Sequence, residues 1–220
     1  MSNHDPHHDW QAGDILAFSG SGRTSLTIRL ATCSAISHVG CVSLVPAWQL
    51  RDLVGCRVVD VEAERLANWN EQPLLFESTT LVDLPCAITG RVIEGVQAHG
   101  PQQRIETYAG RVWRYRLTDA WRQTFHELDG PRRLTGHLLA RIGTQYDGRG
   151  AILAGTRIVK HWWAWSRVDR SSLFCSEYLA SVLQHVGLFP ISNASQVTPA
   201  SLIRTLVADE VYGPPVLVKE

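Results

Sequence analysis

The chain has 220 residues, of which 45% are hydrophobic and 19% are charged, and its 21 basic and 21 acidic residues give a formal net charge of zero. This balance, without a long basic run, argues against nucleic acid as the main partner. No segment approaches the ~20 apolar residues needed to cross a bilayer, and the N-terminus lacks the basic and apolar regions of a secretory signal peptide. We therefore expect a cytoplasmic protein without a transmembrane segment.

The domain organisation is predicted to be simple. Residues 1–11 are mostly polar and are expected to form a flexible tail, whereas residues 12–220 are expected to form a single domain. The chain has five cysteines, an odd number, and no Cys-x-x-Cys pair. That pattern speaks against a disulfide framework and against a structural zinc site, so we expect free thiols and neither metal nor cofactor.

The first elements are predicted from short apolar runs. Residues 14–18 form an apolar run between Gly13 and a Ser/Gly turn, which favours a strand. A helix should follow, because Leu26, Leu30 and Cys33 recur at i, i+4 and i+7. Residues 38–45 then read as a second strand that is buried on both faces.

The middle of the chain is predicted to be rich in strands. Residues 46–72 look like an irregular loop or a short helix. Strands are expected over 74–84 and 91–96, joined by a turn at Thr89-Gly90. Residues 112–117 alternate, with Trp113, Tyr115 and Leu117 on one face and two arginines on the other.

The C-terminal part is predicted to be helical. Two helices are expected at about 119–129 and 132–143, separated by Gly130-Pro131. A later helix should begin near Cys175 and end before Gly187, a residue type that favours the C′ position. Its apolar positions form one inward stripe: Cys175, Leu179, Val182, Leu183 and Val186. Strands interspersed with helices and no internal repeat indicate an α+β domain.

Cys175 and His38 are the residues most suited to chemistry. A thiol is a poor nucleophile near neutral pH until its pKa is lowered, and the first turn of a helix favours a thiolate. An imidazole can take the thiol proton and return it to a leaving group. The ordinary alternatives are that Cys175 is a small core residue and His38 a hydrogen-bonded structural histidine. The other four cysteines are interpreted as packing residues.

Three short motifs resemble a known family. Gly-Asp-Ile-Leu at 13–16, Ser-His-Val-Gly at 37–40 and Phe-Cys-Ser-Glu-Tyr at 174–178 resemble the circularly permuted NlpC-type papain-like hydrolases, and within them the YiiX-like branch. The related lecithin retinol acyltransferase group shares the order of histidine before cysteine. The resemblance covers about residues 12–205. It implies a papain-like α+β fold, in which an antiparallel sheet packs against helices, with Cys175 as nucleophile and His38 as base.

The resemblance also implies a third polar residue that orients the imidazole. Glu77 is the best match, although a surface carboxylate is an equally good interpretation, and Glu94 is the rival. Glu177 is expected to be a structural anchor because i+2 on a helix points away from Cys175. The backbone N–H of Cys175 would bind the oxyanion, and Tyr146 is a candidate second donor or substrate contact.

Three tryptophans at 162–165, among them Trp163, could wall a cleft for an acyl chain or an aromatic ligand, or could simply pack in a core or lid. The predicted function is a cysteine hydrolase that cleaves an amide or ester bond in a small-molecule, peptide or lipid substrate. The alternatives are a lipid acyltransferase or thioesterase-like enzyme, and a non-catalytic ligand-binding module. The sequence leaves the oligomeric state open.

Overall fold

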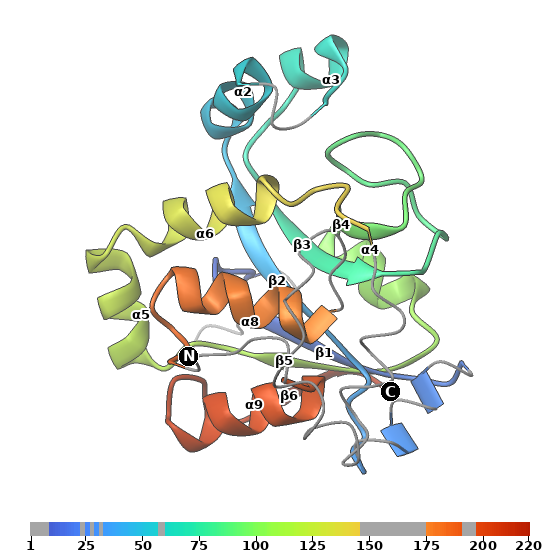
Figure 1. The fold of residues 1–220 in the computed structure, drawn as a ribbon, viewed down its shortest axis with the longest axis vertical. Helices are drawn as coiled ribbons and strands as arrows, with labels where there is room; N and C mark the ends of the chain where they lie inside the picture. Colours follow the sequence, from blue (N-terminus) through green and yellow to red (C-terminus); the bar gives the residue numbers. More distant parts are fainter. Residues whose placement is uncertain are drawn as a thin grey trace, which may run out of the picture.

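The computed structural model describes residues 9–22, 25–26, 29–30, 33–56, 60–145, 175–190 and 197–220. Its centre is one antiparallel sheet. The strands are β1 (Ile15–Gly20), β2 (His38–Val45), β3 (Gln72–Thr79), β4 (Gly95–His99), β5 (Gly110–Tyr115) and β6 (Val216–Lys219). They lie in the order β4-β3-β2-β1-β5-β6, so β2 is at the middle of the sheet between β1 and β3 (Figure 1).

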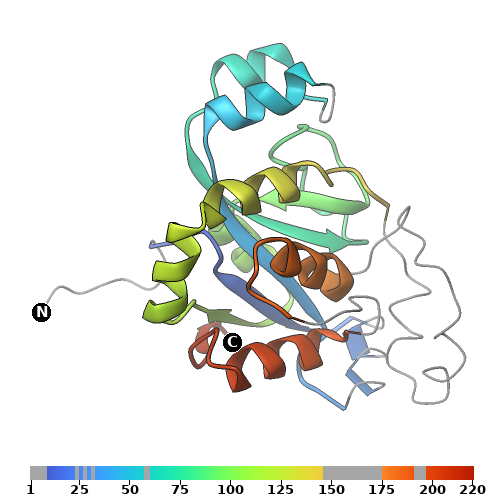
Figure 2. The same ribbon diagram turned by 60° about the vertical axis from the view of Figure 1, so that its left-hand side comes forward.

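Helices cover both faces of this sheet. They are α2 (Ala47–Gly55), α3 (Ala63–Ala67), α4 (Pro101–Thr107), α5 (Asp119–Glu127), α6 (Gly130–Leu139), α8 (Cys175–His185) and α9 (Pro199–Ala208). On one face, α8 packs against β2 and β3, and α6 packs against β2 and α8. On the other face, α4 contacts β3. The two views show α2 and α3 projecting together at one end (Figures 1 and 2). The predicted α+β class, an antiparallel sheet packed against helices, is confirmed.

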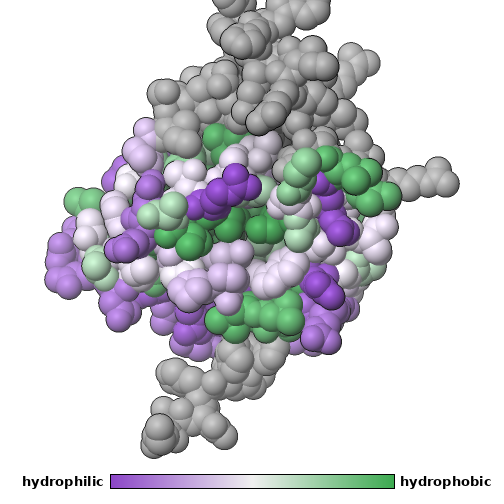
Figure 3. All heavy atoms as spheres, turned by 90° about the horizontal axis from the view of Figure 1, so that it is seen from below, coloured by the Kyte–Doolittle hydropathy of each residue, from purple (hydrophilic) through white to green (hydrophobic). Residues whose placement is uncertain are grey.

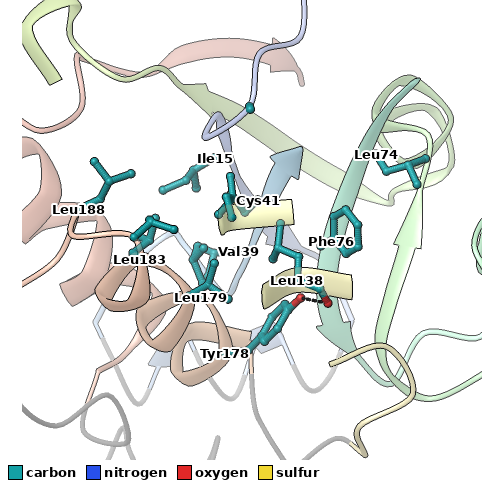
Figure 4. Packing of buried hydrophobic residues seen from close by; sticks show 14 of the residues in the cluster. Ile15, Val39, Cys41, Leu74, Phe76, Leu138, Tyr178, Leu179, Leu183 and Leu188 are labelled. Atoms are coloured by element: carbon teal, nitrogen blue, oxygen red, sulfur yellow. Dashed lines mark hydrogen bonds between the residues drawn. The ribbon is translucent and has the colours of Figure 1, made fainter. Parts of the chain in front are cut away.

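The larger core lies between the sheet and α8. Alternate strand residues such as Val39 and Phe76 point to this side, as expected for side chains that alternate between faces. They meet Leu179 and Leu183 of α8 (Figure 4). The Tyr178 hydroxyl, although buried, donates to a backbone carbonyl of α6 at 3.4 Å, so its polar atom is satisfied. The predicted apolar stripe of α8 is therefore the surface that faces this core.

A smaller core occupies the opposite face. Leu16, Phe18, Val42 and Leu75 from the three central strands meet Ile105 of α4 there. This face is the one on which α4 lies, so both faces of β2 are covered. The prediction that β2 is buried on both sides holds except at His38, which is partly exposed at the start of the strand, and at Leu44, which is 36% exposed.

The end of α8 is a Schellman motif. The Leu188 N–H donates to the Leu183 carbonyl at 2.9 Å and the Gly187 N–H donates to the Gln184 carbonyl at 3.1 Å. Gly187 has a φ of +80°, a conformation that a residue without Cβ adopts at no steric cost. Gly187 is thus the C′ residue that the sequence predicts.

The domain begins earlier than the predicted boundary at residue 12. Arg114 is buried on β5, where its Nε donates to Asp14 at 3.0 Å. The same guanidinium lies over the Trp10 ring at 4.3 Å and donates to the Asp9 carbonyl. Trp10 is itself buried. Residues 9–11, which are predicted to belong to the flexible tail, are therefore attached to the sheet by a buried cation.

Several element boundaries differ from the predictions. The strand expected over 74–84 ends at Thr79, and the strand expected over 91–96 begins only at Gly95. Between them, Pro85 cannot donate to a ladder, and a local turn is closed by the Cys86 N–H on the Arg91 carbonyl. Gly130-Pro131 starts α6 instead of ending α5, because proline fits the first turn of a helix. Both α4 and β6 are absent from the predictions.

The helical spacing of apolar residues after residue 24 does not correspond to a buried face. Residues 25–26 and 29–30 are helical, but Leu26 and Leu30 are 49% and 71% exposed. A spacing that repeats over only two turns does not distinguish a buried stripe from an exposed one. Seen from below, the apolar side chains of the described surface form separate patches among polar ones (Figure 3). Among the helices of the described residues, none is long and apolar enough to span a membrane.

Candidate active site

The structure brings Cys175 and His38 together from distant parts of the chain. His38 is the first residue of β2, and Cys175 is the first residue of α8, which packs across β2 and β3. The Cys175 thiol interacts with the imidazole, and its charge and hydrogen bonding raise the pKa of His38. Cys175 is only 2% exposed, and the His38 side chain is 12% exposed. A helix start and a strand start therefore place a thiol against an imidazole at a nearly buried position.

Glu77 binds the other side of the imidazole. Its Oε2 lies 2.6 Å from His38 Nε2, and its side chain is fully buried. Because Nε2 is occupied by Glu77, Nδ1 is the ring nitrogen that remains for Cys175. The contact expected between Glu77 and His38 is thus present in the structure, whereas the catalytic role of Glu77 stays a prediction.

The absence of a side chain at Gly40 leaves room for the Glu77 carboxylate to reach His38. Glu77 on β3 is paired directly with Gly40 on β2, and Gly40 and His38 share a face because they are two residues apart. A Cβ at Gly40 would lie 2.9 Å from the Leu75 side chain and from the Phe76 carbonyl oxygen, and 3.3 Å from the Glu77 Cβ. The missing side chain lets the carboxylate lean along β2 to the imidazole. This is a physical reason for glycine in the His-Val-Gly motif.

The second oxygen of Glu77 is held by a buried cation. Arg104 of α4 has its Nε 2.7 Å from Glu77 Oε1, and both side chains are fully buried. The Arg104 Nη1 donates to both carboxylate oxygens of Asp83 at 3.1 Å. His99 is close as well, with its Nε2 3.9 Å from Glu77 Oε1. The site is therefore a chain of charged contacts that runs from His38 through Glu77 and Arg104 to Asp83.

This arrangement shifts the pKa values of its members in opposite directions. Burial lowers the pKa of His38, but the charge of Cys175 and its hydrogen bond, together with those of Glu77, outweigh burial and raise it to about 9. Burial raises the pKa of Glu77, but the hydrogen bond to His38 and the charges of Arg104, His38 and His99 bring it down to about 2. Burial lowers the pKa of His99. Glu77 is thus ionised at neutral pH, and the charged form of His38 is favoured.

Glu94, the alternative candidate for orienting the His38 imidazole, does not lie at this site. Glu94 is exposed and precedes the first residue of β4. The carboxylate on His38 belongs to Glu77. Glu177 is 6% exposed within the first turn of α8. Tyr146 and Trp163 lie outside the described residues, as do the other tryptophans of that segment.

The other four cysteines fall into two classes, and all five thiols are free. Cys41 and Cys86 are buried in the core, as predicted, and burial together with the nearby Asp14 raises the pKa of the Cys41 thiol well above its usual value. Cys33 and Cys56 are exposed, so the interpretation of these two as packing residues is wrong. Cys33 has a positive φ of 47°, and Cys56 follows the last residue of α2.

Three residues of the site could not be identified from the sequence: Arg104, His99 and Asp83. The signal that could have located Arg104 is Gly100-Pro101, which marks a helix start; it places Arg104 in the first turns of α4, although not against Glu77. Among the described residues there is no group of three or more His, Cys, Asp or Glu side chains that could hold a metal ion.

A pocket of about 330 Å³ opens beside His38. Four segments build it: the end of β1 with the residues that follow, the start of β2, the end of β3 with the loop after it, and the end of α4 with the residues that follow. Its lining residues are Gly20, Ser21, Gly22, Ser25, Ser37, His38, Thr79, Thr80, Leu81, Asp83, Thr107, Tyr108 and Ala109. Ligand sites combine apolar walls with a few placed polar groups; in this pocket, seven of the 13 lining residues carry a hydroxyl group.

The sequence matches no protein-family model and no curated protein. Among solved structures, the chain is similar to the crystal structure of the metalloprotein YiiX from Escherichia coli O157:H7, with a TM-score of 0.42 and 19% sequence identity. That alignment covers 94% of this chain and 88% of the YiiX chain.

Proposed function

We propose that the protein is a cysteine hydrolase that cleaves an amide or ester bond through an acyl-enzyme on Cys175. The observation that carries the proposal is that His38 contacts Cys175 and Glu77 at the same time, beside a pocket. A thiol, a base and a group that orients the base are the parts that covalent acyl transfer needs.

Each half-reaction follows from this geometry. In the first, His38 accepts the Cys175 proton at Nδ1 and the thiolate attacks the substrate carbonyl carbon. A C–S bond forms, the bond to the leaving amine or alcohol breaks, and His38 returns the proton to the leaving group. In the second, His38 deprotonates a water molecule that attacks the thioester, and the thiol regains the proton. Glu77 holds the imidazolium, and the backbone N–H of Cys175, in the first turn of α8, would bind the oxyanion.

We also propose that the protein is related to the permuted NlpC-type papain-like enzymes. It is supported by the order of the three groups along the chain, with His38 first, Glu77 on the adjacent strand and Cys175 at the start of a late helix. The order by itself leaves the acceptor open, since an alcohol or amine can take the acyl group in place of water.

Intact mass spectrometry after exposure to activated esters of different acyl groups tests the proposal. The exposed Cys33 and Cys56 should first be replaced by serine, so that only the buried Cys41 and Cys86 compete with Cys175. We expect one acyl adduct, mapped to Cys175, that is absent after Cys175→Ala. Products formed with and without an added amine then separate hydrolysis from transfer. An adduct on Cys41 or Cys86, or no adduct from any ester, would contradict the assignment.

His38→Ala tests the base in the same background. The variant should remove the acceleration of Cys175 alkylation by iodoacetamide near neutral pH, because the His38 imidazole is the group proposed to take the thiol proton. Circular dichroism spectra identical to those of the parent would show that the fold is retained. A rate profile that is unchanged by the substitution would refute the pairing.

A further inference from the structure

Arg104 contacts Glu77 with only part of the donor edge that it could use. Its Nε lies 2.7 Å from Glu77 Oε1, in an ion pair that does not have the alignment of a hydrogen bond. The neighbouring Nη2 is buried and has no hydrogen-bond partner among the described residues. Nε and Nη2 lie on one edge of a guanidinium group, and a carboxylate commonly accepts from both in a bidentate pair. The oxygen that would complete this pair is Glu77 Oε2, which instead lies 2.6 Å from His38 Nε2. His38 and Arg104 Nη2 are thus alternative partners for one oxygen.

Asp83 holds the other end of the same guanidinium group. Arg104 Nη1 donates to both carboxylate oxygens of Asp83 at 3.1 Å. Because a guanidinium group is planar and rigid, a rotation that brings Nη2 onto Glu77 Oε2 also moves Nη1 away from Asp83. The ion pair between Arg104 and Asp83 therefore opposes a bidentate pair between Arg104 and Glu77.

Asp83 lies on the loop after β3, in the wall of the pocket beside His38. Leu81 and Asp83 both line this pocket. The loop is attached to β4 by Gln97, whose Nε2 donates to the Leu81 carbonyl at 2.8 Å. The Asp83 side chain is 44% exposed, whereas that of Arg104 is fully buried. Asp83 is therefore the end of the charged chain that the pocket and the solvent can reach.

We propose that Asp83 is a positioning residue of the candidate site, which restrains Arg104 so that Glu77 keeps one oxygen on His38. Without Asp83, Arg104 competes with His38 for Glu77 Oε2, and the imidazolium loses part of its stabilisation. A displacement of the loop that carries Asp83 has the same effect, so the position of the pocket wall regulates the base. The inference rests on the proposed function only for the consequence in catalysis, because the contacts exist without turnover.

The pKa of His38, followed by NMR through its Cε1–H resonance, tests the inference without any turnover. Asp83→Ala should lower this pKa by at least about 0.5, because Arg104 then draws Glu77 away from the imidazole. Alkylation of Cys175 by iodoacetamide should slow about 3-fold or more for the same reason. Asp83→Glu, which keeps the carboxylate, should restore most of both values. An unchanged His38 pKa in Asp83→Ala would overturn the proposal.

Two further variants separate positioning from a direct effect of the Asp83 charge. Asp60→Ala is the matched control, because Asp60 is an exposed carboxylate that pairs with Arg91 outside this pocket, and it should change neither value. In a Glu77→Gln background there is no carboxylate for Arg104 to attract, so Asp83→Ala should lower the pKa of His38 by less than about half as much as in the parent. Equal lowering in both backgrounds would mean that Asp83 acts on His38 through space, and would overturn the positioning role.

Acylation by activated esters then separates this inference from the proposed function. If Asp83→Ala lowers the pKa of His38 but no ester acylates Cys175 in the parent, the positioning role stands and the hydrolase proposal fails. If esters acylate Cys175 and Asp83→Ala changes neither the His38 pKa nor the rate, the hydrolase proposal stands and the positioning role fails. The expected result is acylation of Cys175 that is about 3-fold or more slower in Asp83→Ala and is restored in Asp83→Glu.

Discussion

At the scale of single residues, the carboxylate of Glu77 is shared between a base and a buried cation. One oxygen meets His38 at 2.6 Å and the other meets Arg104 at 2.7 Å. The ion pair with Arg104 holds the carboxylate in place, so its other oxygen is already directed at the imidazole. Arg104 thus acts on His38 only through Glu77, as a positioning residue.

Glu77→Gln tests the contribution of that charge. The variant keeps size and strand propensity but removes the charge that favours the imidazolium, so the pKa of His38 should fall below about 9. The rate of Cys175 acylation should fall by tens- to thousands-fold, about 1.5–4 kcal/mol. NMR titration of His38 and stopped-flow acylation measure the two effects. Glu94→Gln, at an exposed site, is the control and should change neither; an unchanged His38 pKa in Glu77→Gln would exclude the role.

Only some residues of the candidate site could be predicted from the sequence. Cys175 and His38 could be singled out because a helix start and a strand start are local signals. The choice between Glu77 and Glu94 could not be made, since it depends on strand register and on where β4 begins. Arg104 was missed because its contact with Glu77 joins α4 to β3, and no periodicity of either segment predicts that contact.

At the scale of elements, the contact between β2 and β3 depends on one missing side chain. Gly40→Ala should destabilise the fold by about 1–3 kcal/mol, because its Cβ would meet Leu75 and the Phe76 carbonyl at 2.9 Å. It should also weaken the His38–Glu77 contact and lower the pKa of His38. Urea unfolding and NMR titration measure both.

Gly55→Ala is the matched control for Gly40→Ala. A Cβ at Gly55, the last residue of α2, meets nothing within 4 Å. Alanine has the higher helix propensity, so this variant should be neutral or more stable by up to about 1 kcal/mol. If Gly40→Ala behaves like Gly55→Ala, β2 and β3 are not as close at this pair as the structure indicates.

Elements with a clear period were predictable, and elements defined by their partners were not. The positions of β2 and α8 follow from apolar runs and from a helical stripe. By contrast, β6 has only four residues and exists as a strand because it pairs with β5. The short α4 is held from the other end of the chain, where the Lys219 Nζ donates to the carbonyls of Ile105, Glu106 and Tyr108. Such long-range bonds leave no local pattern.

At the scale of the whole molecule, the His38–Glu77 pair makes stability depend on pH at both extremes. The pKa of His38 is raised from 6.5 to about 9, so its contribution is complete below pH 6.5 and is lost as the pH rises through about 9. The pKa of Glu77 is lowered from 4.5 to about 2, so its contribution is complete above pH 4.5 and is lost as the pH falls through about 2. Between pH 4.5 and 6.5 both contributions are complete.

Comparing the stability of wild type with that of His38→Asn isolates the loss of stability expected at alkaline pH. The difference in unfolding free energy between wild type and variant should be largest below pH 6.5 and should shrink as the pH rises through about 9. Urea unfolding at a series of pH values measures this difference and cancels the titration of other groups. A difference that stays constant from pH 6 to 10 would mean that the raised pKa of His38 is not a property of the folded state.

The distance along the chain between His38 and Cys175 has a consequence for biosynthesis. A chain that emerges from the ribosome N-terminus first exposes His38, Glu77 and Arg104 well before Cys175. Strands β1 to β5 can then pair while one face of the sheet still lacks α8, with Val39 and Phe76 uncovered. The thiol meets its base only when α8 docks on that face. If His38 activates Cys175 as proposed, the nascent chain carries a thiol of ordinary reactivity until α8 docks, and the enhanced reactivity of Cys175 is a late marker of maturation.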